Sequence, residues 1–328
     1  LGTSGIEASI VGLGTAAIGG SESQVTPDDK ESIKAIHAAI DAGITLIDTA
    51  PSYGWGHSEE IVGRAIKDRR HDVVIATKCG VWWQDERGSP NGIKDGKAVN
   101  VSLRPDTIVI ELENSLKRLG VDAIDLMQCH KPAIPPDETS IAETMGCLMD
   151  LKGQGKIRAI GVSNVSLDQL RTHHQAGDLA SDQFRYSMLL RDREADILPF
   201  CAEHNIATLT YWSLEQGLLT GKVGPDRVFA ENDFRGNAGE FLPWFKVENR
   251  QRLADMFIGW TDLTDKYNCT IGQLTIAWTA AQPGSTHVLC GARIVEQAVQ
   301  NAGAGSIRLD KDNIQRMRDD LIRLGDPV

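Results

Sequence analysis

The sequence lacks an excess of basic residues, a long apolar run and a secretion signal. Its 328 residues include 45 Asp and Glu against 34 Lys and Arg, for a formal net charge of −11. Nucleic acids and anionic membranes attract excess Lys and Arg, so we expect neither as a partner. No apolar run approaches the roughly 18 residues that a membrane span needs. Residues 1–14 do not resemble a signal peptide, and we therefore expect a cytoplasmic protein.

Motifs typical of metal sites and of dinucleotide-binding sheets are also missing. The six cysteines are widely separated, with no C-x-x-C pair and no Cys/His cluster at zinc spacing. We therefore expect buried free thiols and no metal. The first β-rich run ends in Gly12-Leu13-Gly14-Thr15, which lacks the third glycine of G-x-G-x-x-G. This absence disfavours an open doubly wound sheet.

What is present is a regular alternation of β-rich runs and segments of helical periodicity. The eight expected strands span residues 9–13, 45–48, 73–77, 124–130, 159–162, 182–184, 207–211 and 286–289. The expected helices include 28–41, led by Thr26-Pro27-Asp28, 105–119, stopped by Gly120, 138–152 and 249–266. Eight strand–helix units predict the α/β class and a closed (β/α)8 TIM barrel, formed by residues 1–328 as a single domain.

Two segments between elements, 80–102 and 213–246, are much longer than the usual connections. Both follow strands, so in a barrel they would lie at the C-terminal face, where active sites occur. Several glycines and a proline give the first segment the composition of a mobile loop. We expect both segments to act as lids.

Polar side chains stand at or just after the carboxyl ends of the second, third and fourth strands: Asp48, Tyr53, Lys78 and His130. Consecutive strand ends converge on one mouth of a barrel. There, the ammonium of Lys78 would lower the pKa of Tyr53, and Asp48 would hold Lys78 charged. His130 would orient a substrate oxygen or share in the proton transfer. The four residues predict proton donation to a carbonyl without a metal.

Several ordered motifs resemble the aldo-keto reductase superfamily, in particular its bacterial NADP-dependent members with a long loop after strand seven. They are LGTSG, GLGTAAIGG, GITLIDTAPSYGWGHSEEIVGRAI, ATK, NSLKRLGVDAIDLMQCH, GKIRAIGVSN, LLTGK and GARIVEQAVQNAGA. The resemblance covers essentially the whole chain and implies a (β/α)8 barrel. It also implies that Asp48, Tyr53, Lys78 and His130 are the catalytic residues, with Tyr53 as general acid.

The resemblance further implies a nicotinamide coenzyme bound without a Rossmann motif. Ser163, Asn164 and Gln183 would hold the carboxamide, and Tyr211 would stack on the nicotinamide. The path of the coenzyme would be lined by Gly14, Thr15, Asp48, Leu214, Gln216, Gly217 and Leu218.

The far end of the coenzyme would lie against Gly291 and Arg293. Positions 293, 297 and 301 are spaced i, i+4 and i+8, which places Arg293, Gln297 and Asn301 on one helical face. An Arg near exposed N–H groups at a helix start suits a phosphate, which we interpret as the 2′-phosphate of NADP(H). NAD is the alternative, because Ile294 stands where the family often has a polar residue.

Substrate choice is expected to depend on Trp55, Trp82 and Trp212, together with the two long loops. The first hypothesis is an NADP-dependent oxidoreductase that reduces an aldehyde or ketone to an alcohol, reversible on polyols or sugar-like substrates. The second is a coenzyme-binding regulatory subunit resembling channel β-subunits, with slow turnover. A metal-dependent hydrolase is disfavoured, since no H-x-H follows a strand.

Overall fold

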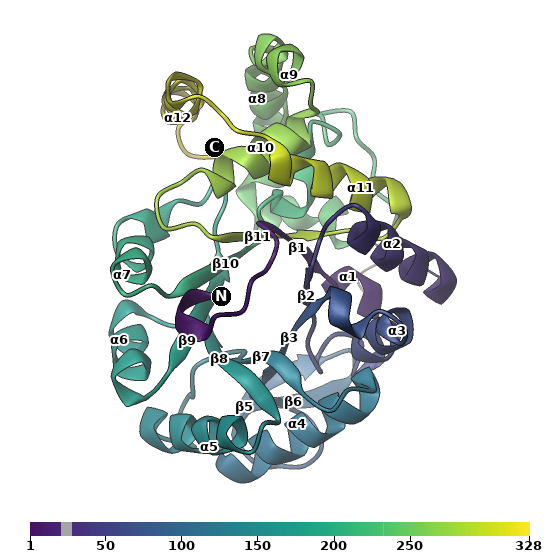
Figure 1. Ribbon diagram of the computed structural model, residues 1–328. Helices are drawn as coiled ribbons and strands as arrows, with labels where there is room; N and C mark the ends of the chain where they lie inside the picture. Colours follow the sequence, from purple (N-terminus) through teal and green to yellow (C-terminus); the bar gives the residue numbers. More distant parts are fainter. Residues whose placement is uncertain (21–27, 232) are drawn as a thin grey trace.

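Eight parallel strands close into a barrel in the computed structural model, which describes residues 1–20, 28–231 and 233–328 (Figure 1). Around the barrel the order is β1-β11-β10-β9-β8-β7-β3-β2, and β1 pairs with both β11 and β2. The barrel strands are β1 (Val11–Gly14), β2 (Leu46–Asp48), β3 (Val74–Cys79), β7 (Ile124–Cys129), β8 (Ile157–Ser163), β9 (Leu179–Arg185), β10 (Ala207–Tyr211) and β11 (His287–Gly291). All eight expected strands are present, so the predicted (β/α)8 barrel is confirmed.

Helices follow the barrel strands and cover the outside of the sheet (Figure 1). They are α1 (Ala16–Gly19), α2 (Asp29–Asp41), α3 (His57–Ile66), α4 (Pro105–Leu119), α5 (Ile141–Gly153), α6 (Leu167–Ala176), α7 (Ile197–Glu203), α8 (Val247–Ile258), α9 (Thr261–Tyr267), α10 (Ile271–Ala280), α11 (Val295–Gly303) and α12 (Lys311–Leu324). Asp28 caps α2 through its side chain, whereas Thr26 and Pro27 lie outside the described residues. Gly120 ends α4 with a φ of 65°, as expected.

The single helix expected over residues 249–266 is wrong. The segment forms two helices, α8 and α9, which meet at Gly259 and Trp260. The indole of Trp260 is fully buried and donates a hydrogen bond to Asp320 of α12. The backbone leaves helical geometry at Trp260, where φ is −107° and ψ is 13°, a break that periodicity alone does not reveal.

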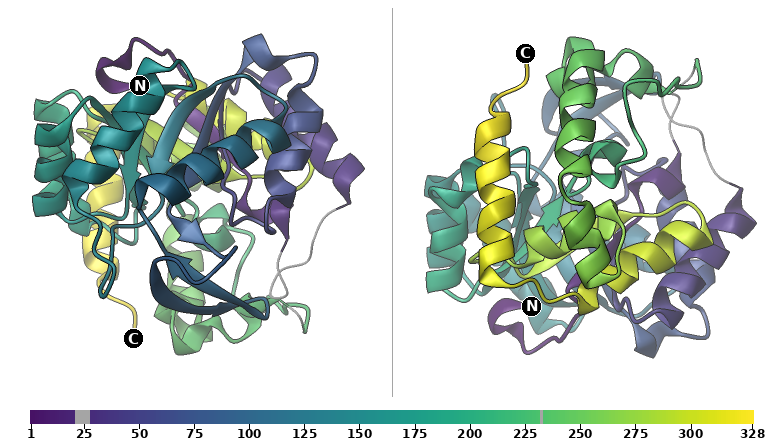
Figure 2. Two further views of the ribbon diagram at one scale, coloured as in Figure 1. Left: turned by 90° about the horizontal axis from the view of Figure 1, so that it is seen from below. Right: turned by 90° about the horizontal axis from the view of Figure 1, so that it is seen from above.

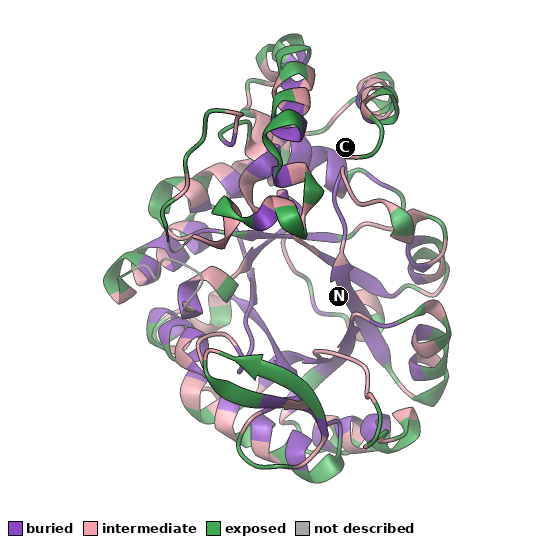
Figure 3. Ribbon diagram, turned by 180° about the vertical axis from the view of Figure 1, so that it is seen from behind, coloured by how far each residue is buried: buried purple, intermediate pink, exposed green. Residues whose placement is uncertain are grey.

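The segment after β3 is an ordered sheet rather than the expected loop. It forms β4 (Val81–Trp82), β5 (Ser89–Lys94) and β6 (Lys97–Val101), in the order β4-β6-β5. This flap, residues 81–101, lies over the C-terminal end of the barrel with its outer strand exposed (Figure 3). Residues 213–246 contain only short 3₁₀ turns in their described part, and they lie at the same end of the molecule as the flap (Figure 2).

Alternation along the strands separates the barrel interior from the layer beneath the helices. Apolar side chains such as Leu46, Ala76, Leu126 and Leu209 pack inside the barrel, and Leu1 and Ile6 join them from the N-terminal segment. That segment crosses the N-terminal opening, opposite the flap (Figures 1 and 2). The interior is thus apolar at its N-terminal end. Its polar side chains begin two residues further along the strands.

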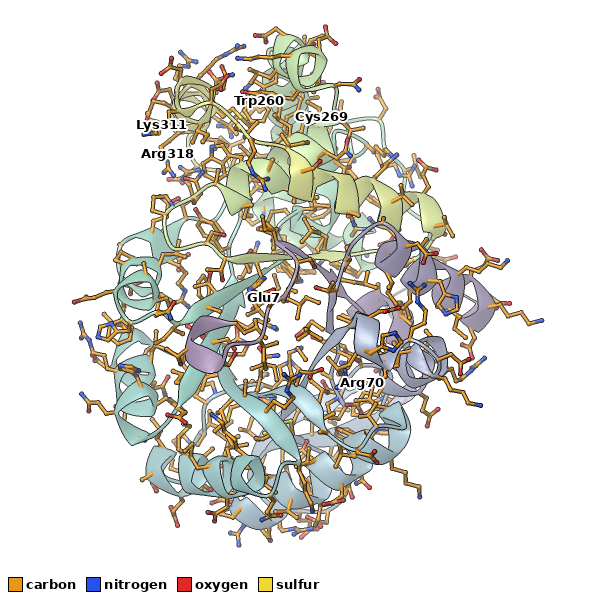
Figure 4. The ribbon with its side chains drawn as sticks, in the orientation of Figure 1. Glu7, Arg70, Trp260, Cys269, Lys311 and Arg318 are labelled. Carbon is orange, nitrogen blue, oxygen red and sulfur yellow. The ribbon has the colours of Figure 1, made fainter. Side chains whose placement is uncertain are left out.

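A second apolar cluster lies outside the barrel, between α8, α9, α10 and α12. Figure 4 marks Trp260 and Arg318 in this region. Elsewhere, four of the six unpaired cysteines are buried, as expected, whereas Cys147 and Cys269 are half-exposed. No helix in the described ranges is long and apolar enough to cross a membrane.

Candidate active site

The ammonium of Lys78 lies at the centre of a hydrogen-bonded group at the C-terminal end of the barrel. Its three N–H bonds reach Asp48 Oδ1 at 2.7 Å, the carbonyl oxygen of Thr49 at 2.8 Å and Tyr53 Oη at 3.3 Å. Lys78 is completely buried, so these partners replace the water that it loses. The charge of Lys78 is thereby directed at the phenol oxygen of Tyr53.

Asp48 is held equally firmly on its other side. Its Oδ2 accepts hydrogen bonds from Gln128 Nε2 at 3.1 Å and Gln183 Nε2 at 2.8 Å. Gln128 and Gln183 stand on β7 and β9, two and four strands away from β2, so side chains that cross the barrel interior fix one carboxylate. The Lys78–Asp48 pair is therefore a preorganised part of the barrel core.

Tyr53 is placed by the turn that leads into α3. Gly54, Trp55 and Gly56 in this turn all have positive φ, at 61°, 59° and 102°. A Cβ on Gly54 would lie 2.0 Å from the carbonyl oxygen of Gly19, so the turn and α1 can touch only at glycine. This close approach seats the Tyr53 phenol above Lys78.

Burial and neighbouring charges together set the protonation of Tyr53 and Lys78. It raises the pKa of Tyr53, and the opposing effect of Lys78 is too small to reverse this shift. The expectation that Lys78 would bring this pKa below its ordinary value is therefore wrong, although its direction of action is as predicted. Burial alone would lower the pKa of Lys78, but Asp48 and Tyr53 raise it above its usual value. Tyr53 is thus protonated and Lys78 charged at neutral pH.

His130 stands beside Tyr53 as a neutral imidazole. Burial, followed by the charges of Lys78, Lys131 and Lys94, holds its pKa well below the ordinary value. The rings of Tyr53 and His130 meet edge to face, with centroids 5.9 Å apart. His130 can therefore offer a hydrogen bond to a substrate oxygen without carrying a charge.

The backbone of His130 is fixed by Asn164. Asn164 Nδ2 donates to the carbonyl oxygen of His130 at 3.1 Å, and Asn164 Oδ1 accepts from Tyr211 Oη at 2.8 Å. Asn164 has a φ of 61°, which turns its side chain back across the mouth of the barrel. Two residues expected to bind the coenzyme thus also position His130.

One cavity of about 740 Å³ connects this group with the start of α11. Sixteen of the residues predicted for the site line it, and fifteen of these are Gly14, Asp48, Tyr53, His130, Ser163, Asn164, Gln183, Tyr211, Trp212, Leu214, Gln216, Gly217, Gly291, Arg293 and Gln297. Asn301 also lines it and donates to the carbonyl oxygen of Gly291 at 3.1 Å. Residues from nearly the whole chain therefore meet in one elongated space.

Five predicted residues are not among those that line the cavity. Lys78 lies beneath Tyr53, and Thr15 and Leu218 are buried behind the wall. Trp82 is 1% exposed, donates to Asp85 and packs under Arg87, so the structure does not place it at the cavity. Trp55 contacts Trp83 and the flap lysines Lys94 and Lys97 instead.

Sequence reasoning missed several residues of the cavity. Lys222, Arg227 and Arg235 line its far arm with Arg293, and Lys131 lines the end that contains Tyr53. Most of these positions have no strand-end signal, because they lie in the long segment after β10. Lys131, however, directly follows His130 and could have been found by extending the strand-end pattern by one residue.

The donor set of the cavity fits a nicotinamide dinucleotide. Amide and hydroxyl groups, with Tyr211 as a ring, lie near Tyr53, whereas four cationic side chains line the opposite arm. Between the two ends, Gln216 and Gly217 line the cavity and Glu215 lies buried behind them; all three residues have positive φ. Arg185 and Ser187 hold the Glu215 carboxylate, and Arg235 donates to the carbonyl oxygen of Gln216. Fixed polar groups at one end and cations at the other match an amide and phosphates.

Comparison with known proteins decides the family. The model of the aldo/keto reductase family matches residues 10–321. The chain belongs to the aldo/keto reductase family. It is 41% identical over 321 residues to the NADH-specific methylglyoxal reductase of Escherichia coli, covering 97% of this chain and 96% of that protein.

Solved aldo-keto reductase structures agree with this assignment. The glycerol dehydrogenase AKR11B4 from Gluconobacter oxydans is 37% identical, with a TM-score of 0.85, covering 99% of this chain and 94% of that one. An aldo-keto reductase from Klebsiella pneumoniae in complex with NADPH is 27% identical, with a TM-score of 0.70, covering 97% and 92%. This aldo-keto reductase is an NAD(P)H-dependent oxidoreductase that reduces carbonyl groups. Nothing in these relatives supports a channel subunit.

Proposed function

We propose that Tyr53 is the general acid that donates a proton to the substrate carbonyl oxygen during reduction. Its phenol is protonated and lies at the end of the cavity. The hydrogen bond from Lys78 is the observation that carries this proposal, because it offers a positive charge to the oxygen that loses the proton. A nicotinamide coenzyme, when bound, supplies the hydride for the carbonyl carbon.

The surrounding residues would prepare this proton transfer. Lys78 stabilises the developing tyrosinate, and Asp48 keeps Lys78 charged and aimed at Tyr53. His130 donates a hydrogen bond to the carbonyl oxygen and orients it toward the phenol. Tyr211 and Asn164 form one wall beside the reacting atoms, and Trp212 bounds the substrate space.

The variant Tyr53→Phe tests the assignment of the acid. It removes the proton donor and keeps the ring, so kcat with aldehydes should fall by about 10²–10⁴-fold. Coenzyme affinity, measured by quenching of tryptophan fluorescence, should change little because the coenzyme arm is untouched. Near-normal turnover in this variant would show that the proton comes from another group.

We also propose that the coenzyme arm accepts NADPH, with NADH as the alternative. Lys222, Arg227 and Arg293 supply positive charge there, whereas the charge of Arg235 is balanced by Asp233 at 2.5 Å. Arg293 is the predicted partner of the 2′-phosphate. The NADH-specific relative shows that family membership alone does not decide this preference.

Replacing Arg293 by Met should weaken NADPH binding by about tenfold and leave NADH binding within about twofold, since only NADPH carries the extra phosphate. Fluorescence titration of both coenzymes in the wild type and the variant measures this difference. Equal losses for NADPH and NADH would contradict the role of Arg293.

Two broader expectations stay proposals as well. A single domain over residues 1–328 is supported by the closure of β1 against β11 and by the family match over 10–321. A cytoplasmic location is supported by the six unpaired thiols, which a reducing compartment preserves.

A further inference from the structure

The cations of the cavity divide into two groups. Lys222, Arg227, Arg235 and Arg293 line the coenzyme arm and have phosphates to bind there. Lys131 lies at the opposite end, in the wall that contains Tyr53 and His130. It follows His130 directly in the chain, so its main chain is fixed with that of the imidazole. The coenzyme chemistry does not account for Lys131.

Lys131 is also without a partner within the described ranges of the chain. Among the described residues, no hydrogen bond or ion pair engages its ammonium, and Lys131 is half-buried. The two carboxylates of the cavity wall are both occupied, Asp48 by Lys78 and Asp233 by Arg235. In a chain of net charge −11, an unpaired ammonium in this position leaves a local positive potential above the reacting atoms.

The flap contributes a second ammonium to the same region. Lys94, at the end of β5, donates to the carbonyl oxygen of Ser52, the residue before Tyr53, at 3.3 Å. Its Nζ lies 5.7 Å from the centre of the Trp55 ring. Lys94 and Lys131 are both near enough to His130 for their charges to disfavour the imidazolium form.

We propose that Lys131, assisted by Lys94, selects carbonyl substrates that carry an anionic group, a carboxylate or a phosphate ester. The anionic group would lie between the flap and the segment after β7, while the carbonyl oxygen reaches Tyr53 and His130. This proposal rests on the proposed function, since it places the substrate by the reacting oxygen. The methylglyoxal and glycerol in the names of two relatives are uncharged. The proposal therefore gives this chain a preference for a different substrate charge.

Matched aldehydes that differ in charge test the proposal. The carboxylate arm compares 4-formylbenzoate with its uncharged analogue 4-formylbenzamide. The phosphate arm compares 4-formylphenyl phosphate with 4-methoxybenzaldehyde. Each rate is measured as kcat/KM with NADH and with NADPH. We expect at least one anionic member to be preferred about threefold to fivefold at low salt, with a preference that falls as ionic strength rises.

Single variants assign the preference to the two lysines. Lys131→Gln should reduce the anionic-to-neutral ratio by about threefold to fivefold, and Lys94→Gln by less, because Lys94 is more exposed. Lys117→Gln is the matched control: it removes one positive charge from an exposed position on α4 and should leave the ratio unchanged. Taking the ratio within each variant cancels any general loss of activity.

The outcomes separate the two proposals. A preference for only one anionic aldehyde would identify the group as carboxylate or phosphate. A ratio near one in the wild type, or a ratio unaffected by Lys131→Gln, would overturn the proposed selection while leaving carbonyl reduction intact. Failure to reduce any of the four aldehydes with either coenzyme would instead contradict the role of Tyr53 in this cavity.

Discussion

Asp48 and Asp182 are both almost fully buried on barrel strands, at 3% and 1% exposure, yet their surroundings are opposite. Asp48 points into the barrel, where an ammonium and two amides donate to it. Asp182 neighbours the inward-facing Gln183 on β9 and therefore points outward, beneath the helices. Neither of its carboxyl oxygens meets the geometry of a hydrogen bond with another described residue.

The difference shows what a buried carboxyl group requires. Burial raises the pKa of Asp182 to about 8, against the weaker opposing influence of Arg193 and the Gln183 N–H. Asp182 is therefore largely protonated, and so uncharged, at neutral pH. Among the described residues, no cation lies close enough to hold it in the carboxylate form. Asp48 has a cation at 2.7 Å and can remain part of a charged pair. The barrel interior thus holds a charged carboxylate at Asp48, whereas the carboxyl group of Asp182, beneath the helices, is uncharged.

Breaking the charged pair should have the largest effect. Lys78→Met leaves the Asp48 carboxylate buried with only amide donors, which should cost about 3–5 kcal/mol of stability. It should also reduce kcat by about 10²–10⁴-fold, because Tyr53 loses its charged partner. Urea unfolding and steady-state rates measure the two losses. In the double variant with Asp48→Asn, stability should partly return and activity should not; parallel recovery of both would contradict the separate roles.

Replacing Asp182, whose carboxyl group has no hydrogen-bond partner among the described residues, should stabilise the protein rather than destabilise it. The folded-state pKa of Asp182 lies above the ordinary value of 3.8, so the native state binds the extra proton between about pH 4 and 8. Wild-type stability should therefore fall across this window by at most about 1.4 kcal/mol per pH unit. Asp182→Asn should remove this fall, so its stability relative to the wild type should be higher at pH 8 than at pH 5.

Urea unfolding at pH 5 and pH 8 measures this difference. Asp122→Asn, at an exposed position before β7, is the matched control and should track the wild type at both pH values. An Asp182→Asn variant whose stability advantage is the same at pH 5 and pH 8 would show that Asp182 does not titrate in this range.

A third buried carboxylate, Asp125 on β7, should give the smallest effect. It accepts hydrogen bonds from Arg70 at 2.7 Å, Arg158 at 2.6 Å and the Ile75 N–H at 2.8 Å. Figure 4 labels Arg70 near the N-terminal side of the barrel. Because the side chain of Arg158 is 57% exposed and Asp125 keeps two donors, Arg158→Gln should cost only about 0.5–1 kcal/mol. A loss of stability as large as that of Lys78→Met would show that a partly exposed ion pair contributes as much as the buried Lys78–Asp48 pair.

Much of the barrel and of its reactive end could be predicted from the sequence. Strands of period two ending in Asp48, Lys78 and His130 point to a common mouth, since parallel strands align their carboxyl ends. The strands β8 and β9 are longer than expected, because they extend at both ends, from Ile157 to Ser163 and from Leu179 to Arg185. Sequence patterns mark the buried centre of a strand better than its ends.

The sequence by itself determined the succession of strands and helices, the class of fold and the residues that would meet Tyr53. Those features follow from local periodicity and from the topology of a parallel barrel. Only the tertiary structure decided that residues 81–101 form a sheet and that Trp82 is buried beneath Arg87. It also left the carboxyl oxygens of Asp182 without a hydrogen-bond partner among the described residues. It also decided that burial raises the pKa of Tyr53 by more than the charge of Lys78 lowers it. Solvent exclusion and partner distance depend on the whole packed molecule, and neither is encoded in the spacing of residues along the chain.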